Sequence, residues 1–509
     1  MSEEEPIQYR GWQPVRSGWM GALSLVGMCE VAAAGLLLVL PVYAHQMSRE
    51  VLAAPMAMAL LLAALTRIQG MTADQWVLVA LKFQWHQAGR RTVFLSGAFA
   101  PRSRTSDRQQ MDLPGVLARL QILSVPTGAG EELGMIYDPA ANTFSAVLEV
   151  KYPGLALVDV DRVNRRVAAW GGLLRSLCVE DGSVVRLAVH ERSLPDDGTA
   201  LRGWVEAHLD PQAPQAAVQV VEELTANGGP GTSARATYLT VTLSAARAKV
   251  SIKSAGGGQL GAGAVLVREL GALEGTLMGA ELEVVDRLSP RRLAEVIRTA
   301  YDPHSVGPMA QRAADAKSPD WQGLPPGVDP ALAGPAAAEA SWSSYRHDGG
   351  HSVTWQVRAW PDGEIYATSL QPLMRPSSVA TRSLAMVYEP LGPRKAKSVL
   401  SRERTKRDVD RRVRARTGRI ESLDERKEAA RADEQDAARV HGHGIVRFTA
   451  LVSLTVMDLD HLEGACAELQ QDGAAAGLEL RRMWGAQDSG FAAAALPLGQ
   501  GLPEHRGLV

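Results

Sequence analysis

The chain has 509 residues, of which 46% are hydrophobic and 22% charged, and this composition excludes a protein that is disordered throughout. The formal net charge of −2 gives no overall attraction to nucleic acid, so we predict no direct nucleic-acid binding. The three cysteines, Cys29, Cys178 and Cys466, are too far apart in the sequence to build a disulfide framework or a paired-cysteine metal site.

Two apolar runs follow an N-terminal segment of residues 1–20. They span residues 21–44 and 51–66 and are separated by a short polar link. A membrane-spanning helix needs about 20 mostly apolar residues, with roughly 17 as the minimum. We therefore predict a transmembrane helical hairpin over residues 21–68. Because Lys and Arg are concentrated outside the link, we expect two spans in the plasma (inner) membrane with both termini in the cytoplasm.

Two alternatives remain open for these runs. They would also suit a buried helical hairpin in a soluble protein. The second alternative is that the first run is a signal peptide, because Val42, Tyr43 and Ala44 resemble a cleavage site. The length of the run and the acidic start of the chain argue against the signal peptide.

Glu30 is the one charged residue inside the first apolar run, and it is our candidate site residue. A charge inside a membrane is unfavourable and points to a functional contact. Small residues nearby, including Gly27 and Gly35, favour close helix packing. We therefore predict that Glu30 contacts a partner helix, with a proton-linked role as the alternative.

The middle of the chain has the pattern of an α+β region. Residues 69–112 form a basic juxtamembrane segment, in which 73–87 is either an amphipathic surface helix or an extension of the second membrane helix. In the first cytoplasmic region, residues 113–302, strands and helices alternate, which predicts ferredoxin-like (split βαβ) units. Two strands are expected within residues 135–153, and one strand each at 183–192, 236–245 and 280–286. Helices are expected at 160–177, 200–209, 216–226, 261–278 and 290–300.

Four segments make up the rest of the chain. We predict a Pro/Ala-rich linker (303–340), a β-rich segment (341–393) with strands 351–360 and 382–390, a charged helix (394–440) and a C-terminal βαβ unit (441–509). The last unit should contain strands 445–456, 478–485 and 491–499 and a helix over 458–476. The charged helix is either a solvated helix or a docking surface for a partner or an anionic headgroup.

No motif for catalysis or cofactor binding emerges from the sequence. The glycine cluster Gly256–Gly263 lacks the lysine of a phosphate loop and predicts a turn before a helix. The remaining candidates are better explained as turns or as buried core than as metal or catalytic sites: His441 with His443, His347 with Asp348 and His351, Asp196 with Asp197, and Cys466. We therefore predict no catalytic, cofactor-binding or metal-binding residue, no cofactor and no enzymatic activity.

Several long strings have a more specific pattern than any short motif. They are YRGWQPVRSGWMG, RVAAWGGLLRSL, HERSLPDDG, LVRELGALEGTL, LSPRRLAEVIRTAYDP and LEGACAELQQDGAAAGLELRRMWGAQDSGFAAAALPLGQGL. With them, the chain resembles an actinobacterial family of proteins with two transmembrane helices, associated with conjugative elements and type IV secretion-like ATPases. It departs from the family by a longer Pro/Ala insertion before Trp342.

The resemblance implies a fusion of a small inner-membrane component with the non-catalytic N-terminal part of a conjugation ATPase. The protein would then be a non-enzymatic structural component of a DNA-transfer apparatus that anchors or docks a separate ATPase. Its expected partners are that ATPase, other membrane channel components and membrane lipid. The sequence leaves open whether the protein also forms a homo-oligomer. The alternative is a subunit of a type VII-like secretion membrane complex.

Overall fold

The computed structural model describes residues 25–43, 47–69, 71–97, 111–128, 130–154, 158–195, 199–210, 212–227, 233–318, 321–361, 366, 368–377, 379–417, 426, 430 and 444–501. The chain forms two compact units. The larger unit contains residues 92–393 and 443–509 together with the first ten residues, and the smaller contains residues 11–91 and 394–442.

The smaller unit contains a helical hairpin. Its elements are α1 (Leu25–Tyr43), α2 (Met47–Leu65), β1 (Arg67–Ile68), β2 (Met71–Thr72), α3 (Ala73–Ala88) and α11 (Pro393–Thr417). Helices α1 and α2 pack along each other, and small side chains are buried in this hairpin, namely Ala34, Ala53, Ala57 and Ala64. Small residues allow two helices to approach closely.

The predicted transmembrane hairpin is wrong. Within the described part of the chain, no helix combines the length and the apolar character needed to cross a membrane. Helices α1 and α2 have 19 residues each. In addition, α1 includes Glu30, and Arg49 and Glu50 occupy the first turn of α2. The two membrane spans and the plasma-membrane location inferred from them are corrected accordingly.

Helix α3 is separate from α2. The β1–β2 hairpin, in which Arg67 pairs with Thr72, lies between them, so α3 is not an extension of the preceding helix. Its apolar side chains Val77, Leu81 and Trp85 are exposed, whereas Phe83 is buried.

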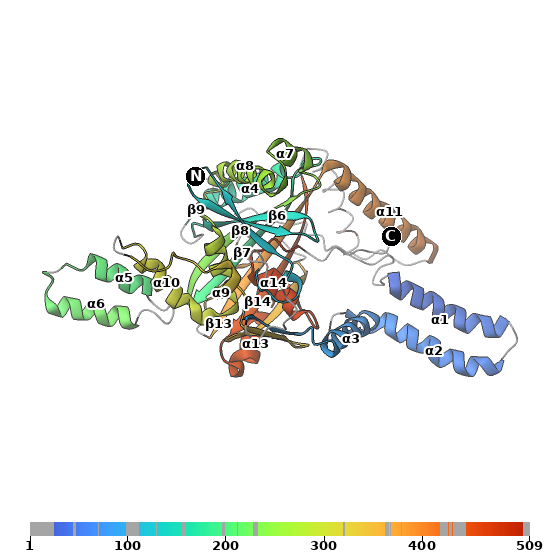
Figure 1. The fold of residues 1–509 in the computed structure, drawn as a ribbon. Helices are drawn as coiled ribbons and strands as arrows, with labels where there is room; N and C mark the ends of the chain where they lie inside the picture. Colours follow the sequence, from blue (N-terminus) through green and yellow to red (C-terminus); the bar gives the residue numbers. More distant parts are fainter. Residues whose placement is uncertain are drawn as a thin grey trace, which may run out of the picture. The chain divides into compact units, whose positions relative to one another are not determined.

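The larger unit is built on a 13-stranded antiparallel sheet (Figure 1). Its first half is one split βαβ arrangement. The elements are β6 (Thr143–Lys151), α4 (Val160–Ser176), β7 (Val184–Pro195), β8 (Ser233–Ser244), α8 (Gly258–Gly279) and β9 (Glu283–Arg287). The strands lie in the order β9-β6-β8-β7, so the first strand lies between the fourth and the third. These elements match the predicted ones closely.

The second half repeats this strand order. Its elements are β12 (Gly350–Ala359), η5 (Gln371–Met374), β13 (Ala380–Leu391), β14 (Ile445–Val456), α13 (Leu462–Ala475) and β15 (Glu479–Arg482). The strands lie in the order β15-β12-β14-β13. The connection between β12 and β13 carries the short 3-10 helix η5 where the first half has α4. Strands from both sides of the charged segment 394–440 therefore form one folded half.

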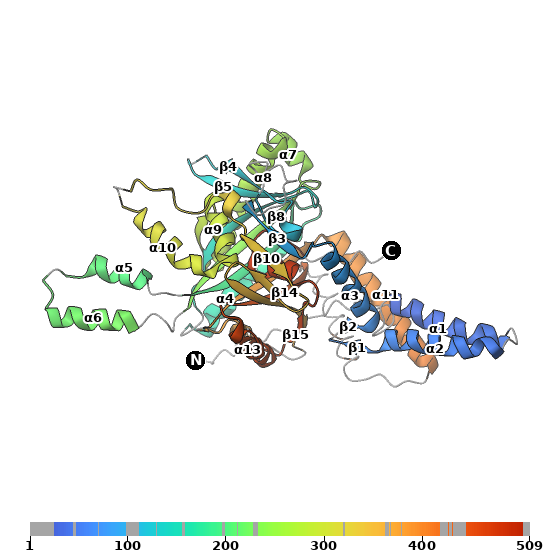
Figure 2. The ribbon, with the colours of Figure 1, turned by 60° about the horizontal axis from the view of Figure 1, so that its bottom comes forward.

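The two halves are joined by the antiparallel pairing of β7 with β13, from Ser383 opposite Arg192 to Tyr388 opposite Leu187. Each half has an insertion between its second and third strands. In the first half this is α5 (Thr199–His208) with α6 (Gln215–Asn227), which extends away from the sheet in both views (Figures 1 and 2). In the second half it is the segment that begins with α11. Because β7 and β13 are antiparallel, the two insertions leave the sheet at opposite ends of this strand pair.

Shorter strands extend the sheet outward from each half. They are β4 (Gln121–Pro126) and β5 (Glu132–Asp138) on one side, and β3 (Val93–Leu95), β10 (Ala337–Ala340) and β11 (Tyr345–His347) on the other. Figure 2 shows β3 beside β10. Strands β5 and β11 form equivalent hairpins with β6 and β12. The resemblance of the two halves therefore includes these hairpins as well.

Helices cover both faces of the sheet. On one face, α4 and α8 pack over the first half and α13 packs over the second. Every second side chain of the strands, such as Leu148, Leu239 and Val452, points toward these helices. The other face is covered by α9 (Pro290–Tyr301) and α14 (Gln487–Ala495).

Two predictions about the secondary structure of these regions are wrong. The strand predicted at 491–499 is mostly helix α14, because four consecutive alanines, residues 492–495, are strong helix formers. The predicted linker 303–340 contains the ten-residue helix α10 (Val306–Asp315), the 3-10 helices η3 (Pro303–Ser305) and η4 (Pro330–Leu332), and strand β10.

A buried ion pair holds α13 on β13. The Arg382 side chain is 3% exposed, and its Nη1 lies 2.6 Å from Asp472 Oδ2, which is 8% exposed. Asp472 also lies 3.0 Å from the exposed Arg375. Removing one member of a buried pair leaves an uncompensated charge.

We predict that Asp472→Ala lowers the free energy of unfolding by about 3–5 kcal/mol, because Arg382 then stays buried without its carboxylate. Glu468→Ala is the matched control on the same helix, since the Glu468 side chain is 62% exposed and lies 4.0 Å from Arg382. Its effect should stay within about 0.5 kcal/mol. Urea denaturation of both variants measures the difference, and equal effects would contradict the role of the pair.

Candidate functional site

The sheet face under α9 and α14 carries polar side chains that are buried. Ser145 and Thr242 share a hydrogen bond of 2.9 Å between their hydroxyl oxygens. Thr240 Oγ1 donates to the carbonyl oxygen of Pro497 at 3.2 Å, and Arg186 Nη1 donates to that of Gly499 at 2.7 Å. These contacts fix the segment after α14 on the sheet.

Gly499 requires glycine at this place. Its φ of +69° is in the left-handed region, and an added Cβ would collide with the Ser145 hydroxyl. The backbone at Gly499 therefore approaches the hydroxyl groups of Ser145 and Thr242 closely.

A small cavity lies on the same sheet face, at the junction of the two halves of the sheet. We call it the central cavity. Its polar lining residues are Arg192, Ser193, Thr299, Thr381, Ser383 and Thr455, and Phe491 and Ala495 of α14 are among the apolar ones. It has room for roughly one water-sized species. Residues from β7, β13, β14, α9 and α14 therefore meet here.

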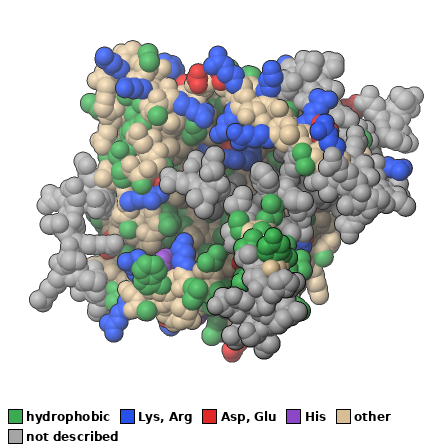
Figure 3. All heavy atoms as spheres, turned by 90° about the vertical axis from the view of Figure 1, so that its right-hand side faces the viewer, with side chains coloured by type: hydrophobic (Ala, Val, Ile, Leu, Met, Phe, Trp, Pro, Cys, Tyr) green, Lys and Arg blue, Asp and Glu red, His purple; other side chains and the backbone are tan. Residues whose placement is uncertain are grey.

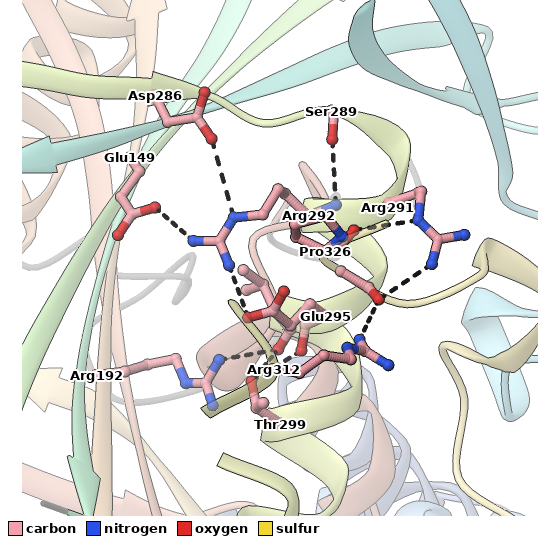
Figure 4. Close-up of polar contacts among 12 residues, drawn as sticks. Glu149, Arg192, Asp286, Ser289, Arg291, Arg292, Glu295, Thr299, Arg312 and Pro326 are labelled. Carbon is pink, nitrogen blue, oxygen red and sulfur yellow. Dashed lines mark hydrogen bonds and ion pairs between the residues drawn. The ribbon is translucent and has the colours of Figure 1, made fainter. Parts of the chain in front are cut away.

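Arg192 is the charged group of the central cavity. Its side chain is 4% exposed, and its Nη1 donates to the carbonyl oxygen of Val296 on α9 at 2.9 Å (Figure 4). Burial lowers the pKa of the guanidinium. The lining residues in the described part of the chain include no aspartate or glutamate. The charge of Arg192 is therefore not compensated by a carboxylate of the lining.

A chain of hydrogen bonds leads from a histidine to the central cavity. His347 Nδ1 lies 2.5 Å from the carbonyl oxygen of Tyr301, which requires a proton on Nδ1. His347 Nε2 lies 2.6 Å from Ser352 Oγ, and Ser352 Oγ lies 2.7 Å from Thr455 Oγ1. With a neutral ring, Ser352 donates to His347 and Thr455 donates to Ser352. A lone pair of Thr455 is then left for a donor in the cavity.

His347 is held neutral by its surroundings. The ring is fully buried among Tyr301, Tyr345 and Phe491. Burial lowers its pKa to about 4, against the smaller opposing effect of the Tyr301 carbonyl. Burial likewise lowers the pKa of His190 to about 4, where Nε2 lies 3.2 Å from the carbonyl oxygen of Ala493. Both rings are therefore neutral at pH 7.

Helix α9, which carries one wall of the central cavity, is anchored by arginines (Figure 4). The helix starts with Ser289 as its cap, whose Oγ accepts from Arg292 N at 3.3 Å, and Pro290 follows in the first turn. Arg292 bridges Glu149 at 3.2 Å and Glu295 at 2.6 Å. Arg291 donates to the carbonyl oxygens of residues 325–327. These arginines therefore hold α9 in place.

Glu30, the predicted site residue, lies on α1 in the smaller unit and is half-buried. Its Oε2 is buried and makes no hydrogen bond to the described residues. Burial, and secondarily the negative charge of Asp74 on α3, raise the pKa of Glu30. Asp74 is 7% exposed. The structure thus brings Glu30 close to a second carboxyl, a neighbour that the sequence analysis did not identify.

The other residues examined in the sequence do not come together as a site. His347 and Asp348 lie at the β11–β12 turn as predicted, where Asp348 accepts from the backbone N–H of Ala336 at 2.8 Å. Cys466 is buried on α13 as predicted, and burial raises its pKa to about 11. The glycine cluster includes the first turn of α8. Asp196, Asp197, His441 and His443 lie outside the described residues. Among those that are described, no group of three or more His, Cys, Asp or Glu side chains is arranged to hold a metal ion.

Sequence reasoning missed Arg192, Ser352 and Thr455. A weak signal was present, since Thr449, Ser453 and Thr455 recur at every second or fourth position of a strand that is otherwise apolar. Such a pattern normally indicates a solvated face. Here α14, which we predicted as a strand, covers that face instead.

No family model matches this chain, and no curated protein matches it significantly. The resemblance to the conjugation-associated family therefore stays a prediction from the strings quoted above.

We predict that the free energy of unfolding falls as the pH is lowered from about 6.5 to about 4, because the unfolded chain protonates its histidines in this range while His347 and His190 stay neutral in the folded protein. Each contributes up to roughly 3 kcal/mol. His347→Gln should remove about half of this slope, measured by urea denaturation at a series of pH values. The exposed His461 provides the control His461→Gln. An unchanged slope in His347→Gln would contradict the assignment.

Proposed function

We propose that this protein is a non-enzymatic assembly component that docks a separate ATPase of a conjugative or type IV secretion-like apparatus. The observation that carries the proposal is the exposed apolar surface of the α1–α2 hairpin. Six of its large apolar side chains are between 53% and 64% exposed, namely Leu36, Val39, Met56, Met58, Leu62 and Leu65. In Figure 3, hydrophobic side chains gather on this hairpin.

The arrangement within the hairpin is the reverse of that in a water-exposed helix pair. Alanines are buried, while leucines, methionines and valines face outward. Each large apolar side chain left in water forgoes about 1.5–3 kcal/mol of burial free energy. Contiguous surfaces of this kind usually mark interaction sites. The hairpin therefore has the composition of a surface that a partner covers.

The identity of the partner comes from the resemblance. The family it resembles is associated with conjugative elements, and its members look like the non-catalytic part of a conjugation ATPase whose motor is encoded separately. A docking component needs a rigid body to which its contact surface is attached. The continuous sheet of the larger unit fits that requirement. A type VII-like secretion complex is the second candidate on the same resemblance.

We predict that the tagged full-length chain, purified from its host, recovers a phosphate-loop ATPase of a conjugation system, as identified by mass spectrometry. The triple variant Leu36→Asn, Val39→Asn, Leu62→Asn should lower the recovery at least about tenfold, because three contact side chains are lost. The matched control is Val250→Asn, Leu260→Asn, Met278→Asn, whose side chains are 72–80% exposed on the larger unit. It should recover as much ATPase as the unmodified chain.

Three outcomes would overturn the proposal. Recovery of type VII components alone would favour the second candidate. Recovery that is equal for both triple variants would show that the hairpin is not the docking surface. Binding of the purified protein to protein-free lipid vesicles, lost in the hairpin variant alone, would show that lipid rather than a protein covers this surface.

A further inference from the structure

We propose that the central cavity binds a halide ion, chloride under ordinary conditions, with Arg192 as its cationic partner. The inference is independent of the proposed docking function, because it concerns the interior of the larger unit. It starts from an imbalance of charge. A buried ion is normally paired, since an isolated charge in a low-dielectric interior is strongly unfavourable.

Arg192 lacks such a pairing within the described residues. Its one hydrogen bond there is to the neutral carbonyl of Val296, and Arg192 is one of the residues that line the cavity. By contrast, two other arginines of the larger unit with side chains at most 5% exposed have carboxylate partners, Arg382 with Asp472 and Arg166 with Glu281. Arg192, which has no carboxylate partner among the described residues, lies at a cavity, and a counter-ion would be placed there.

Besides Arg192, one lining hydroxyl is left to donate to an anion. Thr299 donates to the carbonyl oxygen of Glu295 at 2.9 Å, Thr381 donates to that of Thr455 at 3.4 Å, and the Thr455 hydroxyl donates to Ser352. Ser383 lies directly opposite Arg192 in the β7–β13 pairing, so both side chains point to the same face of the sheet. The Ser193 hydroxyl accepts from Arg382 N at 2.7 Å and donates to the Arg382 carbonyl oxygen at 3.3 Å, so its proton is already used. Ser383 therefore supplies the neutral hydroxyl donor beside the cation. The guanidinium and this hydroxyl together provide the donors that an anion without protons requires.

The size of the cavity determines the class of anion. A space for roughly one water-sized species excludes a phosphate or a carboxylate with its substituents, which leaves a monatomic halide as the class of anion. Phe491 and Ala495 form an apolar wall. A weakly hydrated halide tolerates such a wall better than a polyatomic anion, whose several oxygens would need further donors.

The test compares thermal unfolding of the full-length protein in sodium chloride and in sodium gluconate at equal ionic strength. Because a ligand that binds only the folded state stabilises it, the melting temperature should be higher by a few degrees in chloride. Arg192→Gln should abolish this difference, and Arg192→Lys should retain part of it. Arg346→Gln, at an exposed arginine of β11, is the control and should behave like the unmodified protein.

Equal melting temperatures of the unmodified protein in the two salts would overturn the proposal, as would a chloride effect that persists in Arg192→Gln. A second measurement does not depend on the folding of the variants. Crystals of the unmodified protein grown in sodium bromide should show an anomalous difference peak in the central cavity. A cavity without that peak, filled by water alone, would overturn the proposal.

Discussion

The pairing of β7 with β13 is the constraint on which the rest of the larger unit depends. Each half of the sheet has its second strand at one edge, and an unpaired edge would expose a row of backbone N–H and C=O groups. Joining the two edges satisfies those groups and makes one continuous sheet. It also positions the insertions at opposite ends of the joint, and it brings Arg192 opposite Ser383. The continuous sheet and the central cavity thus both follow from one strand pair.

The two faces of this sheet solve different physical problems. Toward α4, α8 and α13, apolar side chains alternate along the strands and form ordinary cores. Toward α9 and α14, the joint carries hydroxyl groups, histidines and arginines, and these are satisfied largely by backbone carbonyls of the covering helices and of the segment after α14. A buried polar layer of this kind is directional, because each donor must meet its acceptor. It therefore specifies where α9 and α14 lie more sharply than an apolar face would.

The smaller unit has the opposite balance. Its hairpin buries small side chains and exposes large apolar ones, and two of its acidic groups, Glu30 and Asp74, have buried carboxylate oxygens without hydrogen-bond partners in the described part of the chain. A hairpin of this composition is suited to being covered by something else. The sheet of the larger unit, by contrast, has apolar cores on both of its faces.

Much of the secondary structure was determined by the sequence alone, because alternating and helical periodicities are local. The helix expected at 160–177 is α4, and the strands expected at 236–245 and 445–456 are β8 and β14. The sequence did not determine which other part of the protein, if any, packs against each helix or sheet face. The apolar content of α1 and α2 suggested membrane spans. The apolar run of residues 491–498 suggested a strand, although its four alanines favour the helix that forms. The central cavity was also out of reach, since Arg192, Ser383 and Thr455 come from strands far apart in the chain. Only tertiary structure decided these points, because strand pairing and helix packing bring together residues whose proximity no local pattern encodes.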